Sequence, residues 1–182
     1  MHITQHTDYA LRVLIYLQAN GHRLVTIQEI SDRFGISRSH LMKVVNQLIR
    51  AGYVDGLRGK GGGLRLAREA SKIVIGDVVR HMERDFHLVE CFADGSQCLL
   101  TGSCHLRGVL GKALHAFLVV LDQVTLESIM SEHEQRILFM PSMGTGLRKP
   151  VDAEDPLMAC RRVPVSASLD AANDVDDALS GT

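Results

Sequence analysis

The chain has 182 residues, and 46% of them are hydrophobic, which suits one globular core with a tail. No stretch approaches the roughly 18 apolar residues of a membrane span, and the N-terminal segment lacks the pattern of a signal peptide. We therefore expect a cytoplasmic protein with no membrane partner, whose thiols are kept reduced.

The formal net charge of −1 is the sum of a basic N-terminal part and an acidic C-terminal part. Residues 1–68 contain ten Lys and Arg against four Asp and Glu, whereas residues 150–182 contain two against seven. A basic part of this kind is typical of a polyanion-binding surface. A solvated basic surface has the same composition, so charge alone does not decide between them.

Capping residues and apolar spacing predict two helices at the start of the chain. The first is expected over residues 8–19, with Thr7 as its cap. The segment Thr26-Ile27-Gln28-Glu29 is a capping box, in which the Thr and Glu side chains bond free backbone N–H groups. It opens a second helix over residues 27–34, which ends at Gly35.

A third helix and a pair of short strands follow. Ser37 caps a helix through Ala51, and two helices joined by a tight glycine turn predict a helix-turn-helix. Residues 53–54 and 64–66 are expected to be strands around the basic, glycine-rich segment 58–63, which predicts a wing. A glycine-rich loop could instead cradle a nucleotide phosphate, but the GxxxxGK[ST] pattern is missing.

The helix-turn-helix predicts where double-stranded DNA is read. The N-terminal part of its second helix enters the major groove, where polar side chains bond base edges and phosphates. A winged helix that binds protein is the alternative, and the basic excess favours DNA. Residues 1–85 are thus expected to form a DNA-binding domain. The side chains expected at the DNA are Arg38, Ser39, His40, Lys43, Asn46 and Gln47 on the helix, and Arg58 and Lys60 on the wing.

Three cysteines lie close together in residues 86–104, after a segment, 71–84, that begins like a strand and continues as a helix capped near Asp77. Cys91, Cys98 and Cys104 are separated by six and five residues, which is too long for most zinc knuckles. Such spacing suits a loop around a larger centre, and thiolates are the main ligands of iron–sulfur clusters. We therefore predict an iron–sulfur cluster-binding loop.

Other chemistries of these thiols remain open. A structural zinc site and a thiol–disulfide switch use the same residues, and a cysteine-based redox enzyme is the alternative of a different class. No His/Asp partner motif accompanies the thiols, which disfavours the enzyme. Three thiolates leave one ligand position to fill. Its candidates are Asp8, Glu90, His105, Cys160, water and a small ligand.

The last part of the chain divides into a long helix and a tail. Apolar residues recur over about five turns after residue 104, and so wide an apolar face must pack on its own domain or on a twin helix. From residue 141 the composition changes to Pro, Gly, Ser, Ala and Asp. Residues 141–182 are expected to be a disordered acidic tail, with Cys160 as a bystander. The expected fold class is mainly α with a small β-wing.

Several segments resemble the NsrR group, the nitric-oxide-sensitive members of a family of iron–sulfur winged-helix repressors that includes IscR and RirA. The specific segments are His40-Leu41-Met42-Lys43-Val44-Val45 and Leu88-Val89-Glu90-Cys91-Phe92, and the resemblance covers residues 1 to about 135. It implies a homodimer joined by a dimerisation helix within residues 105–135. It also implies release of a palindromic operator when nitric oxide attacks the cluster, so that nitric oxide detoxification genes are transcribed.

The resemblance also implies a ligand set. Cys91, Cys98 and Cys104 would bind one cluster per subunit, and Asp8 would be the fourth ligand, donated across the dimer. IscR-like proteins use a histidine three residues after the last cysteine, where this chain has Arg107, so [4Fe-4S] is expected rather than [2Fe-2S]. The alternative within the family is an iron- or redox-responsive regulator.

Overall fold

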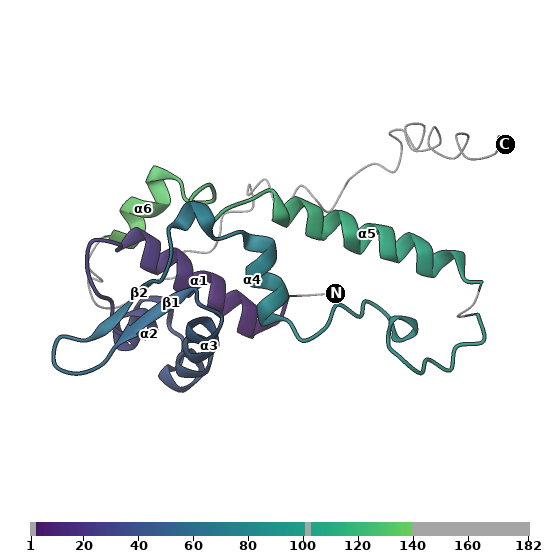
Figure 1. Cartoon of the computed structure of the whole chain (residues 1–182), viewed down its shortest axis with the longest axis horizontal. Helices are drawn as coiled ribbons and strands as arrows, with labels where there is room; N and C mark the ends of the chain where they lie inside the picture. Colours follow the sequence, from purple (N-terminus) through teal and green to yellow (C-terminus); the bar gives the residue numbers. More distant parts are fainter. Residues whose placement is uncertain (1–2, 101–102, 140–182) are drawn as a thin grey trace. The chain divides into compact units, whose positions relative to one another are not determined.

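The computed structural model describes residues 3–100 and 103–139 (Figure 1). The expectations for the tail, residues 141–182, and for Cys160 lie outside the described residues. No described helix is long and apolar enough to cross a membrane.

The first half of the chain forms three helices followed by a hairpin (Figure 1). The helices are α1 (Gln5–Ala19), α2 (Ile27–Phe34) and α3 (Arg38–Arg50). Strands β1 (Val54–Leu57) and β2 (Gly63–Leu66) pair antiparallel. This is the winged helix-turn-helix that the sequence predicts.

The helix starts follow the capping rules, with one correction. The Thr26 and Ser37 side chains accept bonds from backbone N–H groups three residues on, as predicted for α2 and α3. Gly35 ends α2 in the left-handed region at φ 64°. Thr4 caps α1 in place of the expected Thr7, which is buried one turn into the helix.

The core lies between α1, α3, α4 (Ile75–Met82) and the inner face of the wing. It is mainly aliphatic, and it also contains Leu126, from beyond the long helix α5 (His105–Asp122). The largest fully buried side chains include Leu14, Leu17, Ile30, Leu41, Leu48, Ile73 and Leu126.

The wing is attached to the body by a short bridge. Val25 and Leu64 exchange two backbone hydrogen bonds, 3.0 and 2.7 Å long. Gly62 and Gly63 at the start of β2 leave no room for a side chain, because a Cβ at Gly62 would meet the Leu57 carbonyl oxygen. The glycine-rich segment is thus required by a close approach of backbone to backbone.

The segment after the wing contains the 3-10 turn η1 (Ala70–Lys72) and α4. The expected strand-like start is a single bridge from Val74 to Thr125. Asp77 lies in the first turn of α4 and is not its cap, because the cap is Val74, three residues earlier than predicted. A carboxylate there still interacts favourably with the helix dipole.

The long helix is shorter than the expected range of 105–135. It ends at Asp122 because the next residues pair with the start of α4: the Ile75 N–H donates to Val124 O (2.9 Å) and the Leu126 N–H to Ile73 O (2.8 Å). A further helix, α6 (Glu132–Phe139), packs near α1. The chain beyond α5 therefore returns to the body of the molecule, which α1 to α4 and the wing form.

Candidate DNA interface and metal centre

The exposed side of α3 carries most of the side chains that the sequence assigns to DNA. Arg38, Ser39, His40, Lys43 and Asn46 are all exposed, whereas the opposite side of the helix is buried in the core. Arg58 and Lys60 are exposed on the segment between β1 and β2. Residues 38–50 include no Asp or Glu, so the exposed face of the helix is suited to a polyanion.

Gln47 has a different environment from the rest of this set. Its Oε1 accepts a hydrogen bond from His6 Nε2 of α1 (2.8 Å), and its Nε2 donates to the His81 carbonyl of α4 (2.8 Å). Both polar ends of the amide are thus used to hold α3 against two other helices. Gln47 therefore positions α3 and, unlike its exposed neighbours, is not available to contact DNA; no local sequence signal indicates this role.

The three clustered thiols lie on the loop that joins α4 to α5. Cys91 lies in the 3-10 turn η2 (Glu90–Phe92) and Cys104 directly precedes α5; both are half-buried, while Cys98 is exposed. None of the three forms a disulfide. Among the described residues, no three potential ligands lie close enough together to hold a metal ion. The structure places the thiols on one loop without gathering them around a point.

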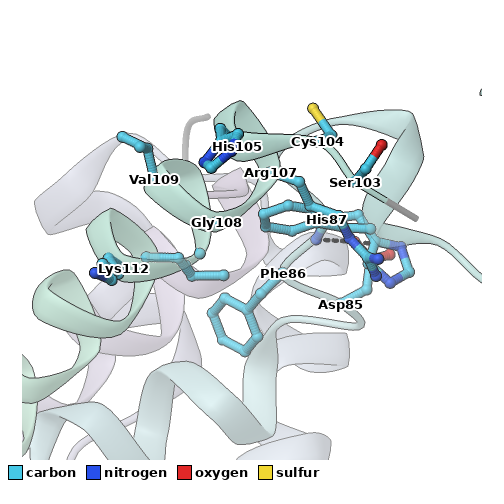
Figure 2. Close-up of a pocket in the computed structure, with 13 residues that line it drawn as sticks. Asp85, Phe86, His87, Ser103, Cys104, His105, Arg107, Gly108, Val109 and Lys112 are labelled. Carbon is cyan, nitrogen blue, oxygen red and sulfur yellow. Dashed lines mark hydrogen bonds and ion pairs between the residues drawn. The ribbon is translucent and has the colours of Figure 1, made fainter. Parts of the chain in front are cut away.

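The end of this loop borders an open groove of about 1130 Å³. Figure 2 shows Cys104, His105 and Arg107 at the start of α5, with Phe86 and His87 from the start of the loop beneath them. Within the loop, the Cys98 N–H donates to Ser96 Oγ (3.3 Å). The donor set fits an iron–sulfur cluster because it offers three thiols on one segment, and thiolates are the usual ligands of such clusters.

Asp8, the expected fourth ligand, is paired within its own helix. Its two carboxylate oxygens each lie 2.9 Å from a guanidinium nitrogen of Arg12, and both side chains are about 43% exposed. The described part of the chain forms no group of three ligands that includes Asp8 and the cysteines of the same subunit. The other two described candidates, Glu90 and His105, are exposed.

Helix α5 has an apolar surface that the described residues of its own subunit leave uncovered. None of its 18 residues is buried, and Leu106 and Val109 are each more than 60% exposed. Its C-terminal end is anchored to α4, where Asp122 accepts two hydrogen bonds from Arg80 (2.5 and 2.7 Å). This pairing lowers the pKa of Asp122 and raises that of Arg80.

A match to a protein-family model shows which family has this architecture. The family model described as "Rrf2: Iron-dependent Transcriptional regulator" matches residues 3–132. The chain belongs to the Rrf2 family. Members of this family are transcriptional regulators, so this Rrf2 protein is a DNA-binding regulator and not an enzyme.

Two regulators named NsrR are similar to this Rrf2 chain. The HTH-type transcriptional regulator NsrR of Bacillus licheniformis is 48% identical over 142 residues, which are 76% of this chain and 99% of the relative. NsrR of Bacillus subtilis is 46% identical over 136 residues, which are 74% and 93% of the two chains. The resemblance to the NsrR group is confirmed by these relatives.

Solved structures confirm the winged-helix fold. CymR, the global cysteine regulator of B. subtilis, has a TM-score of 0.58 at 26% identity, covering 71% of this chain and 95% of its own. T. potens IscR has a TM-score of 0.59 at 24% identity, covering 80% and 94%. At that identity the second match shows the fold alone.

Proposed function

We propose that this Rrf2 protein is an NsrR-type repressor that binds a palindromic operator as a homodimer and releases it in response to nitric oxide. The observation that carries the proposal is the position of Cys91, Cys98 and Cys104. They lie on the loop between the DNA-reading body and α5, and none forms a disulfide. The similarity to two regulators named NsrR supports it.

The three cysteine thiolates would hold one iron–sulfur cluster per subunit, with [4Fe-4S] favoured over [2Fe-2S]. Such a cluster supplies iron atoms that react with nitric oxide, and the exposure of Cys98 leaves a path for a small molecule. Asp8 would be the fourth ligand, from the second subunit. Ligation would compete with Arg12 for the Asp8 carboxylate.

The second subunit would cover α5. A contiguous apolar helix surface exposed to water is typical of an interface, and Leu106 and Val109 lie one turn apart near the cysteine loop. A homodimer through α5 would also give the two recognition helices a fixed spacing on a palindromic operator. The dimer and the cluster site are thus expected to form together.

A chain of contacts connects the cysteine loop to the recognition helix. Glu83, at the start of the loop, accepts hydrogen bonds from the Thr4 N–H (2.8 Å) and Thr4 Oγ1 (3.0 Å) at the start of α1. Two residues further on, His6 bonds Gln47 of α3. Movement of the loop would therefore shift α1 and α3 together. A coupling of about 3 kcal/mol, at the upper end of the usual range, changes DNA affinity by roughly a hundredfold.

DNA contact is proposed for the exposed polar residues of α3 and the wing. Phosphate contacts by Lys and Arg release counterions, so operator binding should weaken steeply with salt. Replacing Arg38 or Lys43 by Ala should weaken operator binding without changing the iron content. The proposed contacts are Arg38, Ser39, His40, Lys43, Asn46, Arg58 and Lys60.

The decisive experiment is anaerobic native mass spectrometry of the purified dimer, followed by operator binding with and without nitric oxide. We expect the mass of each subunit to include the iron and sulfide of one cluster, and specific operator binding to be lost after nitric oxide is added.

Variants test the proposed ligands. Cys104→Ala should abolish the cluster, whereas Cys160→Ala, the matched control, should retain it. Asp8→Ala should keep thiolate-bound iron but change the spectrum or the response rate. Colourless protein with stoichiometric zinc and unchanged binding would overturn the proposal.

A second candidate function is an iron- or redox-responsive regulator of the same fold. The family description as an iron-dependent regulator favours it. Titrating operator release with nitric oxide and, separately, with an iron chelator distinguishes the two. Release by chelator at cluster-equivalent doses, with no response to nitric oxide, would select the iron-responsive function.

A further inference from the structure

Met42 is the most exposed apolar side chain of the recognition helix α3, and it lies among polar residues. Met42 is 47% exposed, although the neighbouring Leu41 and Val44 are completely buried. It lies three residues after Ser39 and four before Asn46, so these three side chains share one exposed side of α3. This is the side that the proposed function turns toward DNA.

The charge of α3 identifies what would cover Met42. Arg38, Lys43 and Arg50 are exposed on the helix, and residues 38–50 include no acidic residue. A protein partner for a methionine would bring its own apolar patch, whereas the N-terminal half of α3 is basic around Met42. The other exposed apolar side chain of the helix, Ile49 (38% exposed), lies two turns further on, beside Gly56 of the wing. The surroundings of Met42 therefore favour a polyanionic partner that has a small apolar group at this position.

The major groove of DNA offers such a group. Base edges there present hydrogen-bond donors and acceptors, and the C5-methyl of thymine is the apolar exception. The methionine thioether cannot donate a hydrogen bond, and its unbranched, flexible chain adapts to an irregular apolar contact. Ser39, Lys43 and Asn46 beside it are the types that bond base edges and phosphates.

We propose that Met42 is a specificity-determining residue that contacts the C5-methyl group of a thymine in each half of the operator. The inference rests on the proposed function, because it requires α3 to lie in the major groove. It adds a sequence preference to that function: a thymine next to the bases contacted by Ser39 and Asn46. Lys and Arg contacts to phosphate provide no such preference.

Replacing thymine by deoxyuridine removes only the methyl group and tests this contact directly. Operator sequences are first selected from random DNA with the anaerobic, cluster-containing dimer. Each thymine is then replaced by deoxyuridine, symmetrically in both half-sites, and binding is measured by fluorescence anisotropy. At one position, replacement of thymine by deoxyuridine should weaken the binding of the wild-type protein by roughly fourfold per half-site. This is the effect of losing one buried methyl-sized group.

The variants assign that loss to Met42. Met42→Ala and Met42→Gln should bind thymine and deoxyuridine operators equally at this position, while Met42→Leu should keep the preference. Arg38→Ala is the matched control: it should weaken binding to both operators and leave their ratio unchanged. Because Met42 is exposed, iron content and folding should be unaltered in all three variants at residue 42.

The possible failures are distinguishable. A wild-type dimer that selects no operator would overturn both the proposed function and this inference. An operator that is selected and bound, with a deoxyuridine scan that shows no sensitive position, would overturn the inference about Met42 alone. A methyl preference that is unchanged in Met42→Ala would also overturn it.

Discussion

The DNA-reading body and the segment of cysteine loop plus α5 differ in how their apolar side chains are covered. Leu14 and Leu41 in the body are completely buried within one chain, whereas Leu106 and Val109 on α5 are more than 60% exposed. The body thus forms its core from its own sequence. Under our proposal, the cysteine loop and α5 are covered by two partners, the cluster and the second subunit. Binding of such partners to the folded chain adds stability.

The largest effect is expected from a cavity in the body. Leu14→Ala should lower the free energy of unfolding by about 2–5 kcal/mol, because a completely buried leucine is lost. Denaturant unfolding followed by circular dichroism measures it. A loss below about 1 kcal/mol would mean that the body is not an independently packed core.

A charge introduced on α5 should weaken association of the two subunits and leave the folding of the body intact. Val109→Asp should weaken the dimer by about 2 kcal/mol, or roughly thirtyfold, because a carboxylate would be buried in the proposed interface. Sedimentation equilibrium measures the dissociation constant, with Val109→Ala as the milder control. An unchanged constant for Val109→Asp would place the dimer interface elsewhere.

The junction of the two regions depends on a glycine. A Cβ at Gly76 would overlap the Asp122 carboxylate, which Arg80 also binds. Gly76→Ala should therefore cost about 1–3 kcal/mol of overpacking, measured as a drop in melting temperature. In the Asp122→Ala background the same substitution should cost less, because the overlapping carboxylate is gone. Equal costs in both backgrounds would contradict this explanation.

Neighbouring polar residues of α3 should separate folding from DNA binding. Gln47→Ala removes two 2.8 Å hydrogen bonds to α1 and α4, and should cost about 1–2 kcal/mol of stability. Asn46→Ala, one residue away and exposed, should leave stability unchanged and weaken operator binding. Thermal unfolding and anisotropy together measure both variants. The opposite pattern would reverse the roles given to these two residues.

The smallest effect is a pH dependence in the body. Hydrogen bonds from Arg23, and secondarily from Tyr16, lower the pKa of Glu29 below its ordinary value of 4.5. Since the folded pKa is the lower one, the ion pair's contribution is present above pH 4.5 and is lost as pH falls through the folded pKa. In Glu29→Gln the free energy of unfolding should therefore decrease less as the pH falls below 4.5. The difference from the wild type should be less than about 1 kcal/mol. A steeper acid limb in the variant would contradict this sign.

Local signals predicted the body well. The bounds of α2 and the caps Thr26, Ser37 and Gly35 follow from hydrogen bonds within a few residues, which a short window of sequence contains. The cap of α1 was misplaced by three residues because both Thr4 and Thr7 offer a hydroxyl, and burial of Thr7 decides between them. The choice between equivalent local signals is made by packing.

By itself, the sequence determined the winged helix, its basic reading face and the placement of three thiols on one loop. Only the tertiary structure decided that α5 ends at Asp122 and that Gln47 turns toward α1 and α4. Bonds such as the one from Leu126 to Ile73 join segments more than fifty residues apart. Their partners are set by how the elements pack, and no local pattern of residue types specifies that.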